Sequence, residues 1–185
     1  LSPDNQKFFY SSDGFLDSIS DTKTNNSITI LRDSVNKNLV TRITDSAGNY
    51  IQLHYEQLGS AGYFVDYSTL NLIQDDASFT IPEKTLYDYE ISGTSYILST
   101  VEHQKNYDSN DAMTTDDTVS YAYDSSVRLT SVDQDGLNSV VYTYSTSNKV
   151  IEIQSYYDSY PIADFFIDYD FQVTTITDQN DDYVI

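Results

Sequence analysis

The stretch that decides the fold is residues 121–145, YAYDSSVRLTSVDQDGLNSVVYTYS, in which short extended runs are separated by turns. The Asp135-Gly136 pair between two of these runs is a strong hairpin signal, because both residue types tolerate positive φ. The large residues of the flanking runs alternate with small or polar ones, a period of two that places them on one sheet face: Val119, Tyr121, Tyr123, Val140, Tyr142 and Tyr144. The stretch therefore predicts an antiparallel meander.

Less complete copies of this pattern recur along the chain. Their apolar anchors lie 21 to 24 residues apart, as between Leu16 and Val40 or between Leu129 and Val150. Such a period holds about two strands of medium length and two turns, so that one repeat is one hairpin. A lone hairpin cannot bury its apolar face, and we expect successive hairpins to lie side by side and share a buried layer.

The composition favours a folded β protein. The 185 residues include 39% hydrophobic residues and eighteen Tyr, which argues against disorder and fits one domain over residues 1–185. Asp, a turn former, far outnumbers Glu, a helix former, and no long amphipathic helix is evident. We predict an all-β antiparallel meander of about ten strands, curved into a barrel-like or half-shell sheet. Its interior should be filled by Tyr, Ile, Leu and Val side chains.

The boundaries of several elements are also predicted. The Tyr63–Glu83 region is expected to hold two strands joined by an acidic turn, with Pro82 ending the second strand because proline lacks an N–H. Residues 107–117, YDSNDAMTTDD, are polar and without periodicity, and we expect them to form a long loop.

Some of these hairpins resemble the YD repeats of RHS-type proteins. The resemblance is carried by Tyr123-Asp124, by Arg128-Leu129-Thr130-Ser131-Val132 and by Asp135-Gly136, with partial copies at 10–16, 43–49 and 144–150. Asn148 stands where the family usually has Gly, a swap that the left-handed conformation tolerates. Val127 stands in the same slot, and because a β-branched residue resists positive φ we expect a different turn there.

The resemblance spans roughly half of the chain, and in the RHS family long arrays of such repeats spiral into a hollow β-shell around toxin or folded cargo. Full RHS proteins also carry a C-terminal self-cleaving core motif. No match to that motif is found here, so no catalytic residue is carried over. The chain is similar as well to exported Gram-negative lipoproteins of unknown function with a porin-like β fold.

The net charge of −20 bears on partners. It repels phosphate backbones and anionic lipid, so we expect binding neither to nucleic acid nor to a membrane surface. Membrane insertion of the chain is not expected either. No run approaches the ~20 apolar residues of a membrane span. The lack of Cys excludes disulfides and thiolate sites, and no cofactor is expected. Because the chain starts at Leu1 and its one Met is Met113, we expect that a leader was removed or that the sequence was trimmed, and any lipid-anchoring Cys would have been lost with it.

Motifs for metal or acid–base chemistry are weak. Asp178–Asp182 matches the opening of an EF-hand loop, but Tyr183 stands where Gly is needed, and Asp108–Asp111 lacks the next ligand, so solvated acidic turns are favoured. His54 and Glu56 share a strand face and can share a metal, although ordinary paired surface residues are the favoured interpretation. We predict no metal site and no catalytic residue.

Aromatic residues near the C-terminus form the candidate ligand-binding set. Exposed Tyr faces beside carboxylates can stack on sugar rings or anchor a protein partner, although Tyr is also an ordinary strand residue. The six residues crowd a short stretch interrupted by Pro161: Tyr156, Tyr157, Tyr160, Phe165, Phe166 and Tyr169.

The predicted function is that of a non-enzymatic, exported structural or interaction module on a bacterial surface or in the periplasm, extracellular or periplasmic in location. The alternative is a ligand-binding module, for glycan among other ligands, that uses the exposed tyrosines. A glycoside-type hydrolase with paired carboxylates is the third hypothesis, since such a pair is set by the fold and is not readable from spacing.

Overall fold

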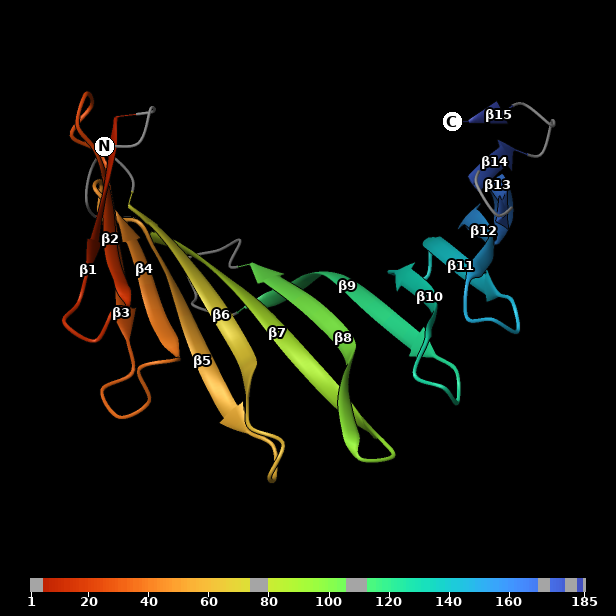
Figure 1. Cartoon of the computed structure of the whole chain (residues 1–185), viewed down its shortest axis with the longest axis horizontal. Coiled ribbons are helices and arrows are strands. Elements are labelled where there is room, and N and C mark those ends of the chain that lie inside the picture. Colours follow the sequence, from red (N-terminus) through yellow and green to blue (C-terminus); the bar gives the residue numbers. More distant parts are fainter. Residues whose placement is uncertain (1–4, 74–79, 106–112, 170–173, 179–182, 185) are drawn as a thin grey trace. The chain divides into compact units, whose positions relative to one another are not determined.

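The chain forms β-strands and turns. The computed structural model describes residues 5–73, 80–105, 113–169, 174–178 and 183–184, and these contain no helix. The strands follow one another in the sheet in chain order, each beside its sequence neighbours (Figure 1). Their bounds are β1 Gln6–Tyr10, β2 Leu16–Asp21, β3 Ser27–Arg32, β4 Val40–Asp45, β5 Tyr50–Gln57, β6 Tyr63–Ile73, β7 Thr80–Ser92, β8 Ser95–Lys105, β9 Thr114–Tyr123, β10 Leu129–Gln134, β11 Asn138–Tyr144, β12 Val150–Tyr157, β13 Tyr160–Tyr169, β14 Thr174–Asp178 and β15 Tyr183–Val184.

The predicted all-β antiparallel meander is confirmed, and every described strand pair is antiparallel. Among the described residues, the strand order has two ends and does not return to β1, and the fifteen strands there exceed the predicted ten. The contacts divide the chain into two compact units, residues 1–87 with 103–116 and residues 88–102 with 117–185. Each unit is described by itself below.

One tight turn recurs in both units and explains why Asp, Asn and Ser replace Gly in so many turns. The first residue of the turn donates its N–H to the carbonyl of the fifth and accepts the N–H of the fourth, as at Asp45, Gly48 and Asn49. The fourth residue has a φ between 61° and 92°, in the left-handed region. The four turns start at Ser11, Asp45, Asp124 and Ser145, and their fourth residues are Gly14, Gly48, Val127 and Asn148.

The expectation of a different turn at Val127 is wrong. Val127 has a φ of 61° and makes the same hydrogen bond to Asp124 that Gly48 makes to Asp45. The flanking contacts hold the backbone in place: the Asp124 carboxylate accepts the N–H groups of Ser126 and Arg128. Val127 is therefore strained by its neighbours into a conformation that its own side chain disfavours.

A tyrosine hydroxyl binds the backbone of the repeat anchor in two of the repeats. The Tyr55 hydroxyl donates to the Val40 carbonyl at 2.8 Å, and the Tyr144 hydroxyl donates to the Leu129 carbonyl at 2.7 Å. Val40 and Leu129 are both anchors of the sequence repeat, and each tyrosine lies fifteen residues after its anchor. The first and second units thus share this hydrogen bond as well as the turn.

Two predicted boundaries are wrong. Pro82 does not end a strand; it is the third residue of β7, opposite Asn71, where the lost N–H removes one bond near the start of the ladder. The predicted loop over residues 107–117 is too long, because Thr114 to Asp117 already belong to β9. The β-branched Thr114 and Thr115 favour an extended backbone, and Asp116 pairs with Lys105 at 2.7 Å.

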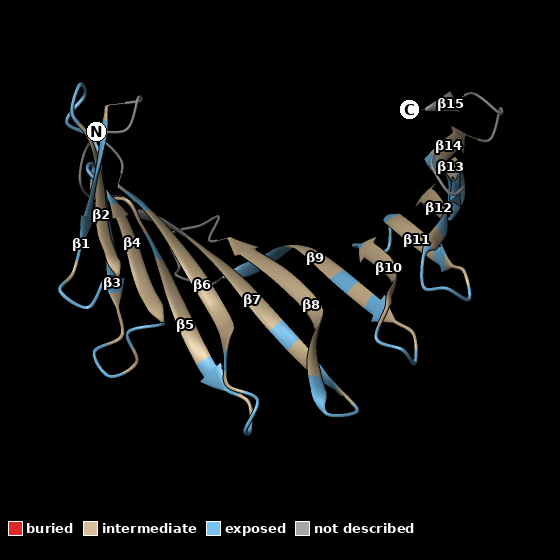
Figure 2. Cartoon of the chain, viewed as in Figure 1, coloured by how far each residue is buried: buried red, intermediate tan, exposed pale blue. Residues whose placement is uncertain are grey.

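The expectation of a filled interior is also wrong for the described residues, none of which is buried (Figure 2). Side chains on the sheet are half-buried by their neighbours in the same sheet, because no second layer of protein lies against them. Each described unit is therefore a single layer, whereas most domains bury an apolar face between two layers.

Stability should depend on pH through the aspartates of the turns. The pKa of Asp45 is lowered by the Asn49 side chain and by backbone N–H groups, and that of Asp33 is lowered by the N–H groups of Asn36 and Val35. The Arg128 side chain lowers the pKa of Asp124, and the N–H of Lys23 lowers that of Asp21. These hydrogen bonds favour the charged form, so their stabilisation is complete above the unfolded-state pKa of about 3.9 and is lost as the pH falls through the folded-state value.

We expect the melting temperature of the native protein to fall more steeply from pH 5 to pH 3 than that of Asp45→Asn, which has lost the ionisable acceptor. Asp13→Asn is the matched control, since it makes the same charge change in the equivalent turn, where the Asp13 side chain makes no hydrogen bond among the described residues. Thermal unfolding followed by circular dichroism at both pH values measures the difference. If the melting temperature of Asp45→Asn falls as much from pH 5 to pH 3 as that of the native protein, the Asp45 carboxylate does not contribute to the pH dependence.

Candidate functional site

An apolar, tyrosine-rich surface covers one face of the second unit. Tyr121 lies opposite Val132, which lies opposite Val140, and Tyr142 lies opposite Ile153, which lies opposite Phe165. Directly opposed residues share a face, so the register joins these side chains into one surface. We call this surface the tyrosine face: Val119, Tyr121, Tyr123, Leu129, Val132, Val140, Tyr142, Tyr144, Val150, Ile153, Ala163, Phe165, Ile167 and Ile176.

The alternation predicted for Tyr121, Tyr123, Tyr142 and Tyr144 is confirmed, because all four lie on this face. All four side chains are half-buried. Burial raises the pKa of Tyr123, and the neighbouring Tyr121 raises it further, so this hydroxyl stays neutral at ordinary pH. The register also places the polar residues Gln134, Asn138 and Ser155 and the acidic Asp178 on this side of the sheet.

The opposite face of the same unit is polar. One row of directly opposed residues across it reads Ala122, Ser131, Val141, Gln154 and Asp164. Gln154 donates to Asp164 at 3.3 Å and accepts the hydroxyl proton of Tyr156 at 3.0 Å. The two faces of the unit thus differ sharply in chemistry, as the period-two alternation predicts.

The predicted ligand-binding set is divided between these faces. Tyr157, Tyr160, Phe165 and Tyr169 lie on the side of the tyrosine face, whereas Tyr156 and Phe166 lie on the polar side. The two residues between Tyr157 and Tyr160 form a tight turn with positive φ, at Asp158 and Ser159. The six aromatics do not form one surface, and their role in ligand binding stays a prediction.

The most exposed aromatics of that set flank the turn. Tyr157 and Tyr160 are directly opposed and are 54% and 72% exposed. Further along, the Lys149 ammonium lies 4.4 Å from the centre of the Tyr169 ring, so one ring face is already covered by a cation.

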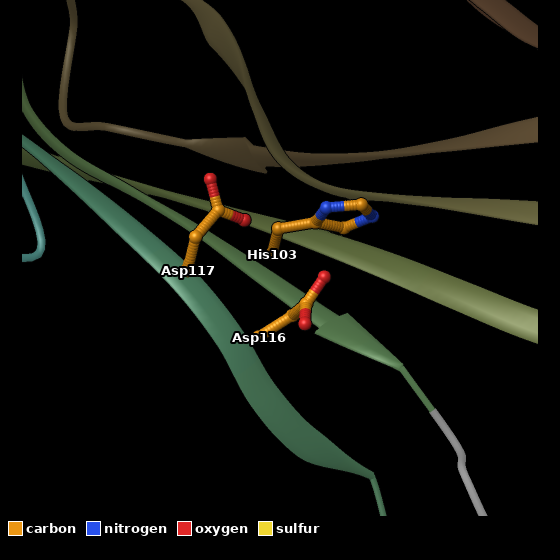
Figure 3. A group of neighbouring side chains, drawn as sticks. All are labelled: His103, Asp116 and Asp117. Atoms are coloured by element: carbon orange, nitrogen blue, oxygen red, sulfur yellow. The ribbon is translucent and has the colours of Figure 1, made fainter.

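The histidines are engaged with neighbouring side chains. His54 stacks on Tyr67 with ring centres 4.1 Å apart and an interplanar angle of 17°. His103 Nε2 lies 3.4 Å from Glu83 Oε2, and Figure 3 shows His103 with Asp116 and Asp117 of β9. Since Asp116 is paired with Lys105, we assign no metal site here. Of the two EF-hand-like stretches, 108–111 lies outside the described residues, and so does Asp178–Asp182 except for Asp178, the last residue of β14.

Sequence reasoning missed a row of side chains on the first unit. Arg42, Gln52, Thr69 and Lys84 are directly opposed across β4, β5, β6 and β7. We call these four residues the cationic row. They lie far apart in the sequence, and no spacing rule connects them; only the strand register brings them into line.

No family model and no curated protein matches the chain. Among solved structures it is similar to the TcdB2-TccC3-Cdc42 complex, with 14% identity over 94% of this chain and a TM-score of 0.42. It is also similar to a porin-like protein from Bacteroides uniformis, with 14% identity over 94% of this chain and 86% of that one and a TM-score of 0.36.

The chain spans 10% of the TcdB2-TccC3-Cdc42 chain that it matches. Similarities of this extent carry no conclusion about family or activity. The relation to YD repeats stays a prediction from the residues quoted above. No helix among the described residues has the length and apolar character needed to cross a membrane.

Proposed function

We propose that the chain is a non-enzymatic interaction module whose tyrosine face binds another protein. The observation that carries the proposal is that this face is uncovered: its Tyr, Val, Ile, Leu and Phe side chains are only half-buried, and no described residue is fully buried. A sheet gains stability when its apolar face is covered by a second layer, and here a partner supplies that layer.

The charge of the second unit indicates that the partner surface is basic. Residues 88–102 and 117–185 hold fifteen acidic and two basic residues, a formal charge of −13. Asp133, Glu152 and Asp164 lie on the polar face, away from the tyrosine face, whereas the turns at the strand ends carry Asp124, Asp135 and Asp158. A surface with an apolar centre and a basic rim complements this arrangement.

A second copy of this chain is a less favourable partner for the tyrosine face than a protein with a basic surface. Each copy carries a net charge of −20, so two acidic rims would repel each other on approach. The same charge opposes nucleic acid as the partner. The proposal places the module outside the cytoplasm, on a bacterial surface or in the periplasm, on the strength of its resemblance to YD-repeat and exported lipoprotein sequences.

Adjacent valines on opposite faces provide the test. Val140 lies on the tyrosine face and Val141 on the polar face, and both are half-buried. The probe is a peptide of alternating Leu and Lys, which presents a leucine face with a basic opposite face when extended. We expect Val140→Asp to weaken its binding roughly tenfold or more, because the new carboxylate must be desolvated without a partner.

Val141→Asp is the matched control and should bind as the native protein does, since its carboxylate faces solvent. Fluorescence anisotropy of the labelled peptide measures both affinities, and circular dichroism checks that both variants fold. The proposal fails if Val141→Asp loses as much affinity as Val140→Asp. It also fails if a peptide of lysines alone binds as tightly, because charge would then account for the binding.

A further inference from the structure

We propose that the cationic row of the first unit binds a linear acidic polysaccharide, whose carboxylate or sulfate groups pair with Arg42 and Lys84. This site lies in a different unit from the tyrosine face and would bind ligands of opposite charge. It is therefore independent of the proposed protein-binding function.

The first argument is the position of the two cations. Arg42 is opposed to Gln52, Gln52 to Thr69 and Thr69 to Lys84, so the four side chains lie on one face in a line across four strands. Three strand spacings, about 14 Å, separate the backbones of Arg42 and Lys84. A linear chain that crosses the four strands along this row would meet one cation at each end.

The second argument is that the cations are held in place. The Arg42 guanidinium lies 3.5 Å from the centre of the Tyr50 ring, and the Lys84 ammonium lies 4.3 Å from the centre of the Tyr67 ring, which also stacks on His54. A cation on an aromatic face has lost much of its freedom before the ligand arrives, and binding therefore costs less entropy.

Neither cation is neutralised by a carboxylate. No described residue forms an ion pair with Arg42 or Lys84, although the chain carries 29 acidic residues. The Arg42 Nε atom is enclosed, so a ligand would bind the outer nitrogens of the guanidinium. By contrast, Lys105 and Arg128 both contact an aspartate. Arg42 and Lys84 thus keep donors that an anionic ligand can use.

The third argument is the chemistry between the charges. Gln52 and Thr69 fill the row, and the next row on the same face reads Thr29, Thr44, Tyr50 and Asn71. Neutral hydroxyl and amide groups both donate and accept hydrogen bonds, as the hydroxyls of a sugar chain require. Neither row contains a carboxylate.

The test uses polygalacturonate and dextran sulfate as the uronate and sulfate probes, with neutral dextran as the uncharged control. Isothermal titration at about 0.15 M salt screens the remote carboxylates, since the Debye length there is about 8 Å. We expect at least one acidic probe to bind and neutral dextran not to bind. Binding of polygalacturonate alone would identify carboxylate as the recognised group, and binding of dextran sulfate alone would identify sulfate.

Two variants locate the site. Gln52→Glu places a carboxylate between the two cations at almost unchanged size, and Lys84→Gln removes one charge; each should lower the affinity roughly tenfold. Gln57→Glu in the same strand and Lys23→Gln in a distant turn make the same charge changes elsewhere and should bind as the native protein does. Circular dichroism checks that each variant folds. If Gln52→Glu does not fold, the affinity of Lys84→Gln alone tests the position of the site.

Three results would overturn the proposal. In the first, neither acidic polysaccharide binds the native protein. In the second, the control variants lose as much affinity as Gln52→Glu and Lys84→Gln. In the third, poly-L-glutamate binds as tightly as the polysaccharides, which would assign the row to an acidic peptide.

Discussion

Replacing Val127 by Gly is expected to raise the free energy of unfolding by about 1 kcal/mol. The left-handed conformation costs a residue with a Cβ about 1–2 kcal/mol, and the greater freedom of glycine in the unfolded chain offsets about 0.5–1 kcal/mol of the gain. Val127 has a φ of 61° and is 41% exposed, so its side chain contributes little packing that the substitution would remove. Asn148 occupies the equivalent position of the next repeat with a φ of 63°.

The reverse substitution provides the control. Gly14 holds the same position in the first repeat with a φ of 83°, and nothing lies within 4 Å of the place where its Cβ would stand. Gly14→Val should therefore destabilise the protein through backbone strain alone, by roughly 1 kcal/mol. Urea unfolding of the two variants and the native protein measures both effects. If Val127→Gly is no more stable than the native protein, the strain assigned to this turn is absent.

Replacing Arg128 by Ala is expected to lower the melting temperature by roughly 3–6 °C. Arg128 joins two successive repeats: its Nε and Nη2 atoms each lie 2.6 Å from Asp124 Oδ2, and Nη1 donates to Asn148 Oδ1 at 2.9 Å. Its guanidinium also lies 4.6 Å from the centre of the Tyr144 ring. The substitution removes the hydrogen bonds and the ring contact together, and it leaves the Asp124 carboxylate with backbone donors alone.

Lys149 is the matched control for Arg128. Both are the fifth residue of the recurring turn, and both lie over a tyrosine ring, at 4.4 Å for Lys149 and Tyr169. Lys149 forms no ion pair with a described carboxylate. Differential scanning calorimetry should show a smaller loss for Lys149→Ala than for Arg128→Ala. Equal losses would mean that the ring contact, and not the bridge to Asp124 and Asn148, supplies the stabilisation.

Much of the fold was readable from local patterns. The alternation of Tyr121 and Tyr123 with Ser120 and Ala122 predicted both the strand and the shared face, because successive side chains of a strand point to opposite sides. The turn at Val127 was misjudged because intrinsic preference is a weak guide where several hydrogen bonds determine the backbone. Pro82 was misplaced for a related reason, since a proline near the start of a strand removes only one bond of the ladder.

The candidate sites were less readable. The aromatic set from Tyr156 to Tyr169 is crowded in the sequence, but the alternation of a strand sends Phe165 and Phe166 to opposite faces. Arg42 and Lys84 show the converse, because residues forty-two positions apart become neighbours in one row through the register of four strands. Register depends on contacts between distant segments, which local patterns do not contain.

The amino-acid sequence by itself determined that this protein is an antiparallel β meander, where its Asp-rich turns fall and which tyrosines share a face. These properties follow from the period of two and from turn chemistry, which act over a few residues. Only the tertiary structure decided that no described residue is buried and that Arg42 and Lys84 lie in one row. Layering and register are set by long-range contacts, and the same strands could have been covered or left open.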